Sequence, residues 1–485
     1  MSAEGLVIIA LMLPVGGAVL IAASHRAPNL REAASIATAL ALVTAVASLL
    51  PAVLDGGEPT IRWFAIFPGL AVEFRVEPLG LLFAIVASAL WLVSSVYSIG
   101  YMRANDESRQ TRFYVCFALA LASTIGVAFA GNLLTLLIFY EALTLVTYPL
   151  VTHHGDQEAK RGGRTYLGIL LLTSTVFLLP AIVATWMVAG TLDFTPGGIL
   201  GDRLSAGAAT ALLALYVFGI GKAALMPFHR WLPAAMVAPA PVSALLHAVA
   251  VVKAGVFTIV KVIVYVFGIG ASTADFSWLP YVAGFTVLAA SVVALRADNL
   301  KRRLAYSTIS QLSYVVLATA ILAPISIVGA ALHIVAHAFG KITLFFAAGA
   351  IYTAAHKTEV SQLDGIGRRM PWTLTAFAIG ALSMIGLPPT GGMVSKWYMV
   401  SGAFQAEHWF ALAVIVASTL LNAGYFVPIV YRAFLREPAA EATAHGEAPW
   451  TMVVALIATS ALTVLLFFCA DVPLVLARML AGIAR

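Results

Sequence analysis

The sequence predicts an all-α membrane protein that crosses the bilayer about fourteen times. Of its 485 residues, 61% are hydrophobic and only 10% are charged. In soluble domains roughly a quarter of all residues are charged. The mean hydropathy is +0.96. Apolar runs of about 20 residues, the length that crosses a hydrocarbon core of about 30 Å, recur along the whole chain.

The apolar runs define the expected spans in order. They are 5–23, 33–53, 78–100, 113–130, 132–152, 164–189, 207–238 (interrupted), 240–267, 276–296, 300–321, 324–354, 372–403 (interrupted), 408–434 and 449–475. The chain opens with Glu4, without a basic stretch or a small-residue cleavage site, so the first run is expected to be a retained helix and not a signal peptide.

Basic residues gather in alternate connections between the spans. With the N-terminus outside, the inside loops hold 18 of the 28 Lys and Arg, and the outside holds 5. The positive-inside rule then predicts a multi-pass protein of the cell inner (plasma) membrane with both termini on the outer side. The same bias explains the net charge of +6, so no nucleic-acid partner is expected.

The remaining basic residues are five lysines inside spans: Lys222, Lys253, Lys261, Lys341 and Lys396. A charge at mid-bilayer costs about 2.5–3.5 kcal/mol on insertion scales, so such groups usually face a polar interior or a water-filled path. Lys261 lies late in its span, where snorkelling to the interface is as good an explanation. Lys341 and Lys253 lie too deep for that, which indicates a functional role.

A single carboxylate, Glu141, lies well inside a span. One helix also carries His333, His337 and Lys341 at intervals of four residues. That spacing turns about 400° and rises about 6 Å per step, which places the three groups in one row on a helix face. The alternative to a functional role is that His333 and His337 are neutral and hydrogen-bonded to neighbouring helices. Their alignment with a lysine favours a proton relay.

Two of the spans are expected to be broken. Pro227, Pro233, Pro239 and Pro241 remove backbone donors around the seventh, and Gly386, Pro388, Pro389, Gly391 and Gly392 interrupt the twelfth. Irregular backbone at that depth is tolerated only where it is buried in protein or lines a cavity. Broken helices five spans apart predict two inverted five-helix repeats, each with one broken helix.

These spans divide the chain into four parts. They are 1–112 (three helices with an external hairpin over 56–78), 113–267 (first repeat, helices 4–8), 276–434 (second repeat, helices 9–13) and 449–485 (helix 14).

No cofactor or metal is expected. The two cysteines, Cys116 and Cys469, form no CxxC pair. The segment 153–164, HHGDQEAKRGGR, is expected to be a solvated loop. No cluster of membrane carboxylates suggests a sodium cage.

Four segments together resemble the proton-translocating antiporter-like subunits shared by respiratory complex I, membrane-bound hydrogenases and Mrp-type cation/proton antiporters. The segments are GKAALMPFHRWLPAAMVAPAPVSALLHAVAVVKAGV, DNLKRRLAYSTISQLSYVV, HIVAHAFGKITLFFAAG and GLPPTGGMVSKW. The resemblance covers about residues 75–435. Within the family, TYPLVTHHGDQEAKRGGRTYLGILLLTS and TWMVAGTLDF look most like the Mrp D subunit.

The resemblance implies a role in proton transfer for eight residues. Glu141 looks like the family's carboxylate that pairs with the lysine at Lys222, and His247 and Lys253 look like bridging groups. His333, His337 and Lys341 resemble the central relay, and Lys396 resembles the terminal ionisable group. The sequence departs from the pattern of the family in two ways. It has a lysine at 396, where some homologues carry glutamate, and it lacks the long lateral helix of the largest complex I subunit.

The expected function is therefore a proton-conducting subunit of a multisubunit Mrp-type Na⁺/H⁺ antiporter, with other integral membrane subunits as partners. As an isolated chain it would be part of a transporter and not an enzyme. A proton-pumping subunit of a complex I-like oxidoreductase or hydrogenase is the nearest alternative. A self-contained solute transporter and a structural anchor are two others, but both leave five lysines within spans unexplained.

Overall fold

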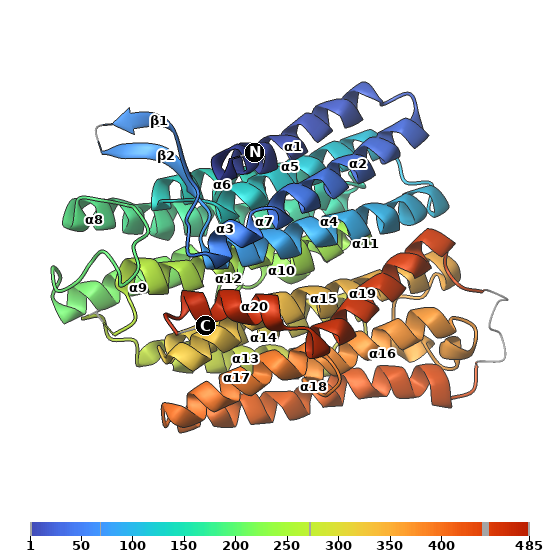
Figure 1. Cartoon of the computed structure of the whole chain (residues 1–485). Coiled ribbons are helices and arrows are strands. Elements are labelled where there is room, and N and C mark those ends of the chain that lie inside the picture. The colour runs from blue at the N-terminus through green and yellow to red at the C-terminus, as the bar shows by residue number, and fades with distance from the viewer. Residues whose placement is uncertain (1, 68, 271–272, 439–445, 484–485) are drawn as a thin grey trace.

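The computed structural model describes residues 2–67, 69–270, 273–438 and 446–483 as a bundle of helices with one small β-hairpin. The helices run side by side, with the hairpin at one end of the bundle (Figure 1). We call this the hairpin end and the opposite end, where Arg103, Arg109 and Arg112 lie, the basic end.

The N-terminal part consists of four helices and the hairpin. The elements are α1 Ala3–Ala23, α2 Pro28–Ala47, α3 Leu50–Leu54, β1 Thr60–Phe67, β2 Leu70–Arg75 and α4 Pro78–Ala104. The strands pair antiparallel with Thr60 opposite Arg75, which confirms the expected hairpin. Strand β2 is fixed to the start of the helix Leu133–Val151, because Asn132 Nδ2 donates to Ala71 O at 2.8 Å and Glu73 N donates to Thr135 Oγ1 at 3.0 Å.

The next part of the chain carries the first broken helix. The elements are α5 Gln110–Ala128, α6 Leu133–Val151, α7 Gln157–Thr173, α8 Leu179–Ala189, α9 Ala206–Gly219, α10 Trp231–Ala234, α11 Ala240–Ala244 and α12 Val251–Val262. Helix α9 ends at Gly219, and the chain turns through Gly221–Ala223, as the proline pattern predicted. The expected eighth span is helical over Ala240–Phe267, but it contains π-helical turns at Leu245–Val249 and Ile263–Phe267 that the sequence did not indicate.

The last part carries the second broken helix. The elements are α13 Trp278–Arg296, α14 Leu300–Ala320, α15 Pro324–Ala355, α16 Pro371–Ile385, α17 Gly391–Gln405, α18 Trp409–Leu435, α19 Trp450–Phe468 and α20 Asp471–Leu480. Gly386 ends α16 with a φ of +91°, a conformation that favours glycine. A Cβ on Gly392 would lie 1.8 Å from Ser383 O, so only glycine lets the two half-helices approach this closely.

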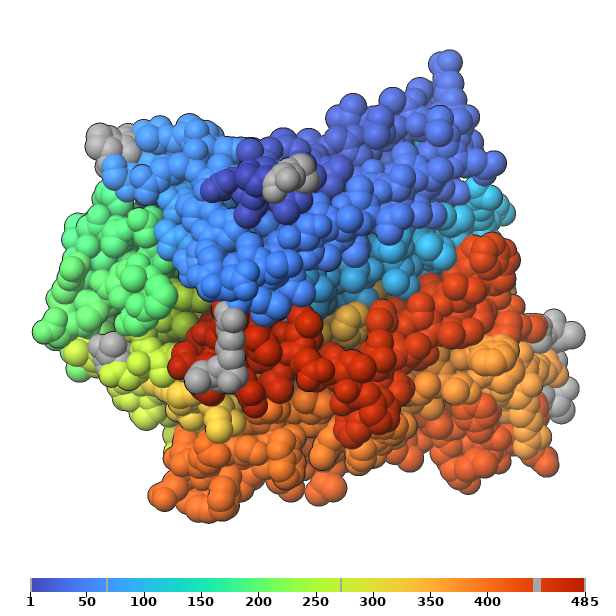
Figure 2. Space-filling model, in the orientation of Figure 1, coloured from blue at the N-terminus to red at the C-terminus, as the bar shows by residue number. Residues whose placement is uncertain are grey.

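The expected final span, 449–475, is wrong in its extent. Helix α19 ends at Phe468, and Asp471 begins the separate helix α20. Helices α19 and α20 pack against α4, so the C-terminal helices adjoin the N-terminal ones on one face of the molecule (Figure 2).

The chain is a multi-pass membrane protein. Within the described ranges, eleven helices are long and apolar enough to cross a membrane, and α9 and α16 are shorter apolar helices. The count of fourteen crossings stays a prediction, as do the inverted symmetry and the four-part division.

Two helices form the centre of the bundle. The most apolar part of Ala240–Phe267, which contains α12, is 100% buried, and that of α15 is 94% buried, whereas α1, α2 and α19 are buried to 39% or less. The peripheral helices present large apolar side chains outward, such as Leu20 and Leu420, as lipid contact requires. Ionisable residues on α12 and α15 are therefore enclosed by protein and do not face lipid.

Candidate functional site

Lys222 lies in the turn that breaks the first interrupted helix, and it is fully buried. Its ammonium donates to Tyr140 O and to Thr144 Oγ1, both at 2.6 Å, and lies 3.2 Å from the centre of the Tyr140 ring. Tyr140 and Thr144 are one helical turn apart on α6 and so share a face. The broken helix thus delivers a lysine to a polar pocket made by one face of α6.

Glu141 does not form the expected ion pair with Lys222. In the described part of the chain no carboxylate lies within 4.0 Å of the Lys222 ammonium, and both Glu141 oxygens are buried without a hydrogen-bond partner. The reason is helix geometry, because Glu141 is turned about 100° from Tyr140 on α6. The carboxylate still attracts the ammonium electrostatically, and it is the only acidic group on α6.

Helix α12 packs directly on the turn that carries Lys222. A Cβ on Gly255 would lie 2.3 Å from Ala223 N and 2.3 Å from Lys222 C. Only a glycine permits this contact between backbones. Two residues earlier on α12 is Lys253, so the same close contact positions Lys222 and Lys253 relative to each other.

Lys253 meets the central helix α15 at His337. The Lys253 ammonium lies 2.7 Å from His337 Nδ1, and both side chains are fully buried. In such a bond one nitrogen carries the proton and the other supplies the lone pair. Since the His337 Nε2 has no partner, the ring is free to exchange a second proton on its far side.

His247 is fully buried in a π-helical turn just before α12. Neither ring nitrogen has a hydrogen-bond partner, and the ring lies 4.6 Å from that of Phe345, measured between centres. A buried imidazole with two unpartnered nitrogens fits a site that water occupies intermittently.

The other members of the α15 row face different neighbours. His333 lies 2.9 Å from Ser395 Oγ and 3.0 Å from Gln311 Oε1. Lys341 donates to Leu304 O at 3.2 Å and to Ser307 Oγ. The His333 and His337 ring centres are 6.0 Å apart, too far for a direct hydrogen bond. The members of the row therefore make separate contacts with α12, α14 and α17 and are not hydrogen-bonded to one another.

Lys396 lies beside the second break. Its ammonium donates to Met384 O at 3.1 Å and Ile385 O at 2.8 Å, and Thr419 Oγ1 is 3.3 Å away. Met384 and Ile385 are the last residues of α16, and the end of a helix carries partial negative charge. The break thus creates the acceptors that hold this lysine.

Sequence reasoning missed several buried ionisable groups, among them Glu73, Glu77 and His153, and most of the polar neighbours. Glu77 directly precedes the expected span 78–100, yet it is buried and lies 3.1 Å from Lys261. The snorkelling explanation for Lys261 is wrong, since that lysine is fully buried. The run STISQLS, which supplies Ser307 and Gln311, was a usable signal, because so many hydroxyl and amide groups rarely face lipid.

A second polar cluster lies at the basic end, in loops outside the spans. Glu107 lies 3.5 Å from His153 and 3.3 Å from His154. Burial raises the pKa of Glu107, but the interactions with the two adjacent histidines outweigh this effect and lower the pKa to about 2. Glu107 and His154 line a cavity of about 530 Å³ together with Lys301 and Lys357. The described residues contain no group of three or more His, Cys, Asp or Glu arranged to hold a metal.

Comparison with known proteins places this chain in a family. Residues 130–422 match the model for NADH:quinone oxidoreductase/Mrp antiporter transmembrane proteins. The chain is 34% identical to NADH-quinone oxidoreductase subunit N of Desulforudis audaxviator, over 83% of this chain and 80% of that protein. It is 29% identical to hydrogenase-4 component B of Escherichia coli, over 82% of this chain but only 63% of that protein.

The fold agrees with solved structures. A chain of the Mrp complex from Dietzia sp. DQ12-45-1b superimposes with a TM-score of 0.87 at 23% identity, covering 99% of this chain and 97% of that one. A chain of the membrane-bound sulfane sulfur reductase, an archaeal respiratory complex, gives 0.86 at 21% identity, covering 98% and 96%. The chain therefore belongs to the NADH:quinone oxidoreductase/Mrp antiporter family and is an antiporter-like membrane subunit of Mrp or complex I-like assemblies.

Proposed function

We propose that this chain conducts protons across the membrane as one subunit of a multisubunit Mrp-type Na⁺/H⁺ antiporter. The observation that carries the proposal is the contact between Lys253 and His337, at 2.7 Å, between the two most buried segments of the bundle. Burial disfavours the charged form of lysine and makes proton release near neutral pH accessible. Histidine titrates there already.

The proposed path begins at Lys222, where the Glu141 carboxylate stabilises the charged ammonium. When that attraction is relieved, Lys222 passes its proton to Lys253 on the neighbouring helix. The proton then moves to His337 along the existing hydrogen bond.

From His337 the proton reaches Lys341 and finally Lys396, through water and the hydroxyl groups between them. His247 and His333 flank the path and accept protons from it. Charges at neighbouring sites interact strongly at low dielectric, so the occupancy of one site biases the next.

The membrane potential supplies the driving force. One charge that crosses the membrane is worth about 2.3 kcal/mol per 100 mV, which an antiporter uses to drive a cation out. Lysine and histidine exchange protons but offer no oxygen ligands for Na⁺. We therefore assign proton transfer to this chain and Na⁺ movement to partner subunits.

A second candidate is a proton-pumping subunit of a complex I-like oxidoreductase or hydrogenase. The 34% identity with an NADH-quinone oxidoreductase subunit N favours it, whereas the sequence TYPLVTHHGDQEAKRGGR favours the Mrp D subunit by resemblance. Both candidates use the same buried residues. They differ in the partners and in the energy source.

Both candidates require other integral membrane subunits and a plasma membrane with the basic end inside. Three experiments distinguish the two candidates: purification in mild detergent, mass spectrometry of the co-purifying subunits, and reconstitution into liposomes. An Mrp antiporter acidifies or alkalinises the lumen in response to a Na⁺ gradient without any electron donor. A complex I-like subunit co-purifies with iron–sulfur proteins, and its proton transport requires a reductant.

A further inference from the structure

A buried ion pair near the hairpin end lies outside the path described above. Lys261, on α12, places its ammonium 3.1 Å from Glu77 Oε1 and donates to Ala130 O at 2.8 Å. The side chain of Lys261 is 0% exposed and that of Glu77 is 4% exposed. Tyr265 OH donates to the second oxygen, Glu77 Oε2, at 2.9 Å.

Glu77 is held rigidly at the start of α4. Its carboxylate accepts hydrogen bonds from Leu79 N at 2.9 Å and Gly80 N at 3.0 Å. The positive end of the helix dipole lies at the same place. The acidic partner is therefore fixed, and the long side chain of Lys261 is the part that can move.

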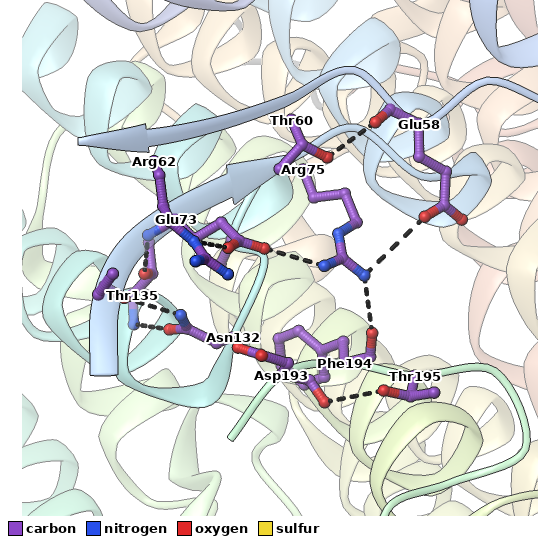
Figure 3. Close-up of polar contacts among 12 residues, drawn as sticks. Glu58, Thr60, Arg62, Glu73, Arg75, Asn132, Thr135, Asp193, Phe194 and Thr195 are labelled. Atoms are coloured by element: carbon purple, nitrogen blue, oxygen red, sulfur yellow. Dashed lines mark hydrogen bonds and ion pairs between the residues drawn. The ribbon is translucent and has the colours of Figure 1, made fainter. Parts of the chain in front are cut away.

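Outside this pair, ionisable groups continue to the surface. Arg75 lies 3.9 Å from Glu58 and 2.9 Å from Glu73 (Figure 3). The side chain of Arg75 is 25% exposed and that of Glu58 is 40% exposed. Glu58, Arg75, Glu77, Lys261 and Tyr265 all line one small cavity of about 10 Å³, which has room for roughly one water molecule.

Toward the interior, Lys261 follows Lys253 by eight residues on α12. That separation is about 12 Å along the helix axis, a distance that a few water molecules can bridge. The pair thus lies between the proposed proton path and the hairpin surface.

We propose that Lys261 and Glu77 form the mouth of a second entry at the hairpin end, which joins the proton path at Lys253. This inference rests on the proposed function. A hydronium ion in the cavity gives its proton to Glu77 while Lys261 is neutral, so that an O–H bond of the hydronium breaks, an O–H bond forms on the carboxylate and a water molecule is left. The O–H bond then breaks as an N–H bond forms on Lys261, which restores the carboxylate and the ion pair. Lys261 finally releases its proton through water toward Lys253 and is neutral again.

The charged groups that face the pair set its response to pH. They are Arg75 at the end of β2 and Glu58 before β1, and the titratable phenol of Tyr265 lies beside them on the same helical segment as Lys261. A mouth of this kind makes the transport rate depend on pH at the hairpin side. An ion pair that only joins α4 to α12 has no such effect.

The test compares variants of the intact complex in liposomes of known orientation, with a pH-sensitive dye inside. Lys261→Arg keeps the ion pair, but arginine cannot release a proton. Glu77→Gln keeps the helix cap, but glutamine cannot take up a proton. We expect each to reduce transport at least tenfold at normal assembly. Thr258→Val, at a fully buried position on the same helix, is the matched control and retains transport.

Lys253→Arg separates failure of the mouth from failure of the proposed function. If Lys253→Arg is inactive while Lys261→Arg transports at the wild-type rate, the mouth is refuted and the central path stands. If Lys253→Arg is active, both are refuted. Glu77→Gln with wild-type transport and an unchanged dependence on hairpin-side pH also overturns the mouth.

Discussion

The Lys253 ammonium lies 2.7 Å from His337 Nδ1, and neither side chain is exposed. Two basic groups at this distance cannot both be charged without strong repulsion, so one of them carries a proton that the other can accept. Each belongs to one of the two most buried segments of the bundle, Ala240–Phe267 and α15. This contact is where we place proton transfer between the two halves of the chain.

Replacing Lys341 tests the relay on α15. Lys341→Ala removes the ammonium that bonds Leu304 O and Ser307, and Lys341→Arg keeps the charge but stays protonated at any accessible pH. We expect both variants to assemble and both to lose transport, measured as cation-dependent dequenching of a pH dye in everted vesicles. An active Lys341→Arg means that the residue supplies charge and not protons.

The loading site is tested by Glu141→Gln and Lys222→Ala. The first removes the charge that attracts Lys222 while keeping the size of the side chain, and the second removes the ammonium held by Tyr140 and Thr144. We expect loss of transport in both, with normal membrane insertion, in a pH-gradient assay normalised to protein. Wild-type transport by Glu141→Gln refutes the electrostatic coupling, and an active Lys222→Ala together with an inactive Glu141→Gln gives Glu141 a separate role.

Gly255→Ala tests the contact between α12 and the turn of Lys222. The added methyl group would meet the backbone at 2.3 Å, and overpacking of this kind typically costs about 1–3 kcal/mol. We expect a lower thermal midpoint and slower transport. Gly168→Ala is the control, because a Cβ there has nothing within 4 Å, and it should leave both quantities unchanged. Equal behaviour of the two variants argues against the contact.

The Glu107 cluster predicts a pH-dependent contribution to stability at the basic end. The hydrogen bond to Glu107 raises the pKa of His154, so the stabilisation is complete below the ordinary histidine value of about 6.5 and is lost as the pH rises through the raised pKa. Glu107, whose pKa is lowered to about 2, stays charged throughout that range.

We therefore expect the difference in thermal midpoint between wild type and His154→Gln to be largest near pH 5.5 and to shrink by pH 8.5. Differential scanning fluorimetry of the assembled complex measures it. A difference that grows with pH contradicts the assignment of His154 as the titrating partner.

Much of the fold could be predicted because its signals are local. The apolar runs locate the helices, and the prolines and glycines near Lys222 and Lys396 mark both breaks, since these residues act on the backbone where they stand. The π-helical turn that holds His247 and the end of α19 at Phe468 were not predictable in this way. They depend on packing between segments distant in sequence.

The candidate site was predictable in its residues but not in its contacts. Lysines within spans are visible in the sequence because they are costly there. Which neighbour each lysine meets depends on how the helices are rotated. The rotation of α6 turns Tyr140 and Thr144 toward Lys222 and leaves Glu141 at the side, and no local pattern reveals that rotation.

The most direct measurement of proton transfer at the Lys253 and His337 contact uses His337→Gln. Glutamine keeps a hydrogen-bond acceptor for the lysine but cannot take up a proton at physiological pH. The assay is proton flux into liposomes that contain the purified complex, with the amount of assembled complex matched to wild type. Proton transfer through His337 predicts a flux reduced to the level of empty liposomes, whereas a flux equal to wild type would contradict it.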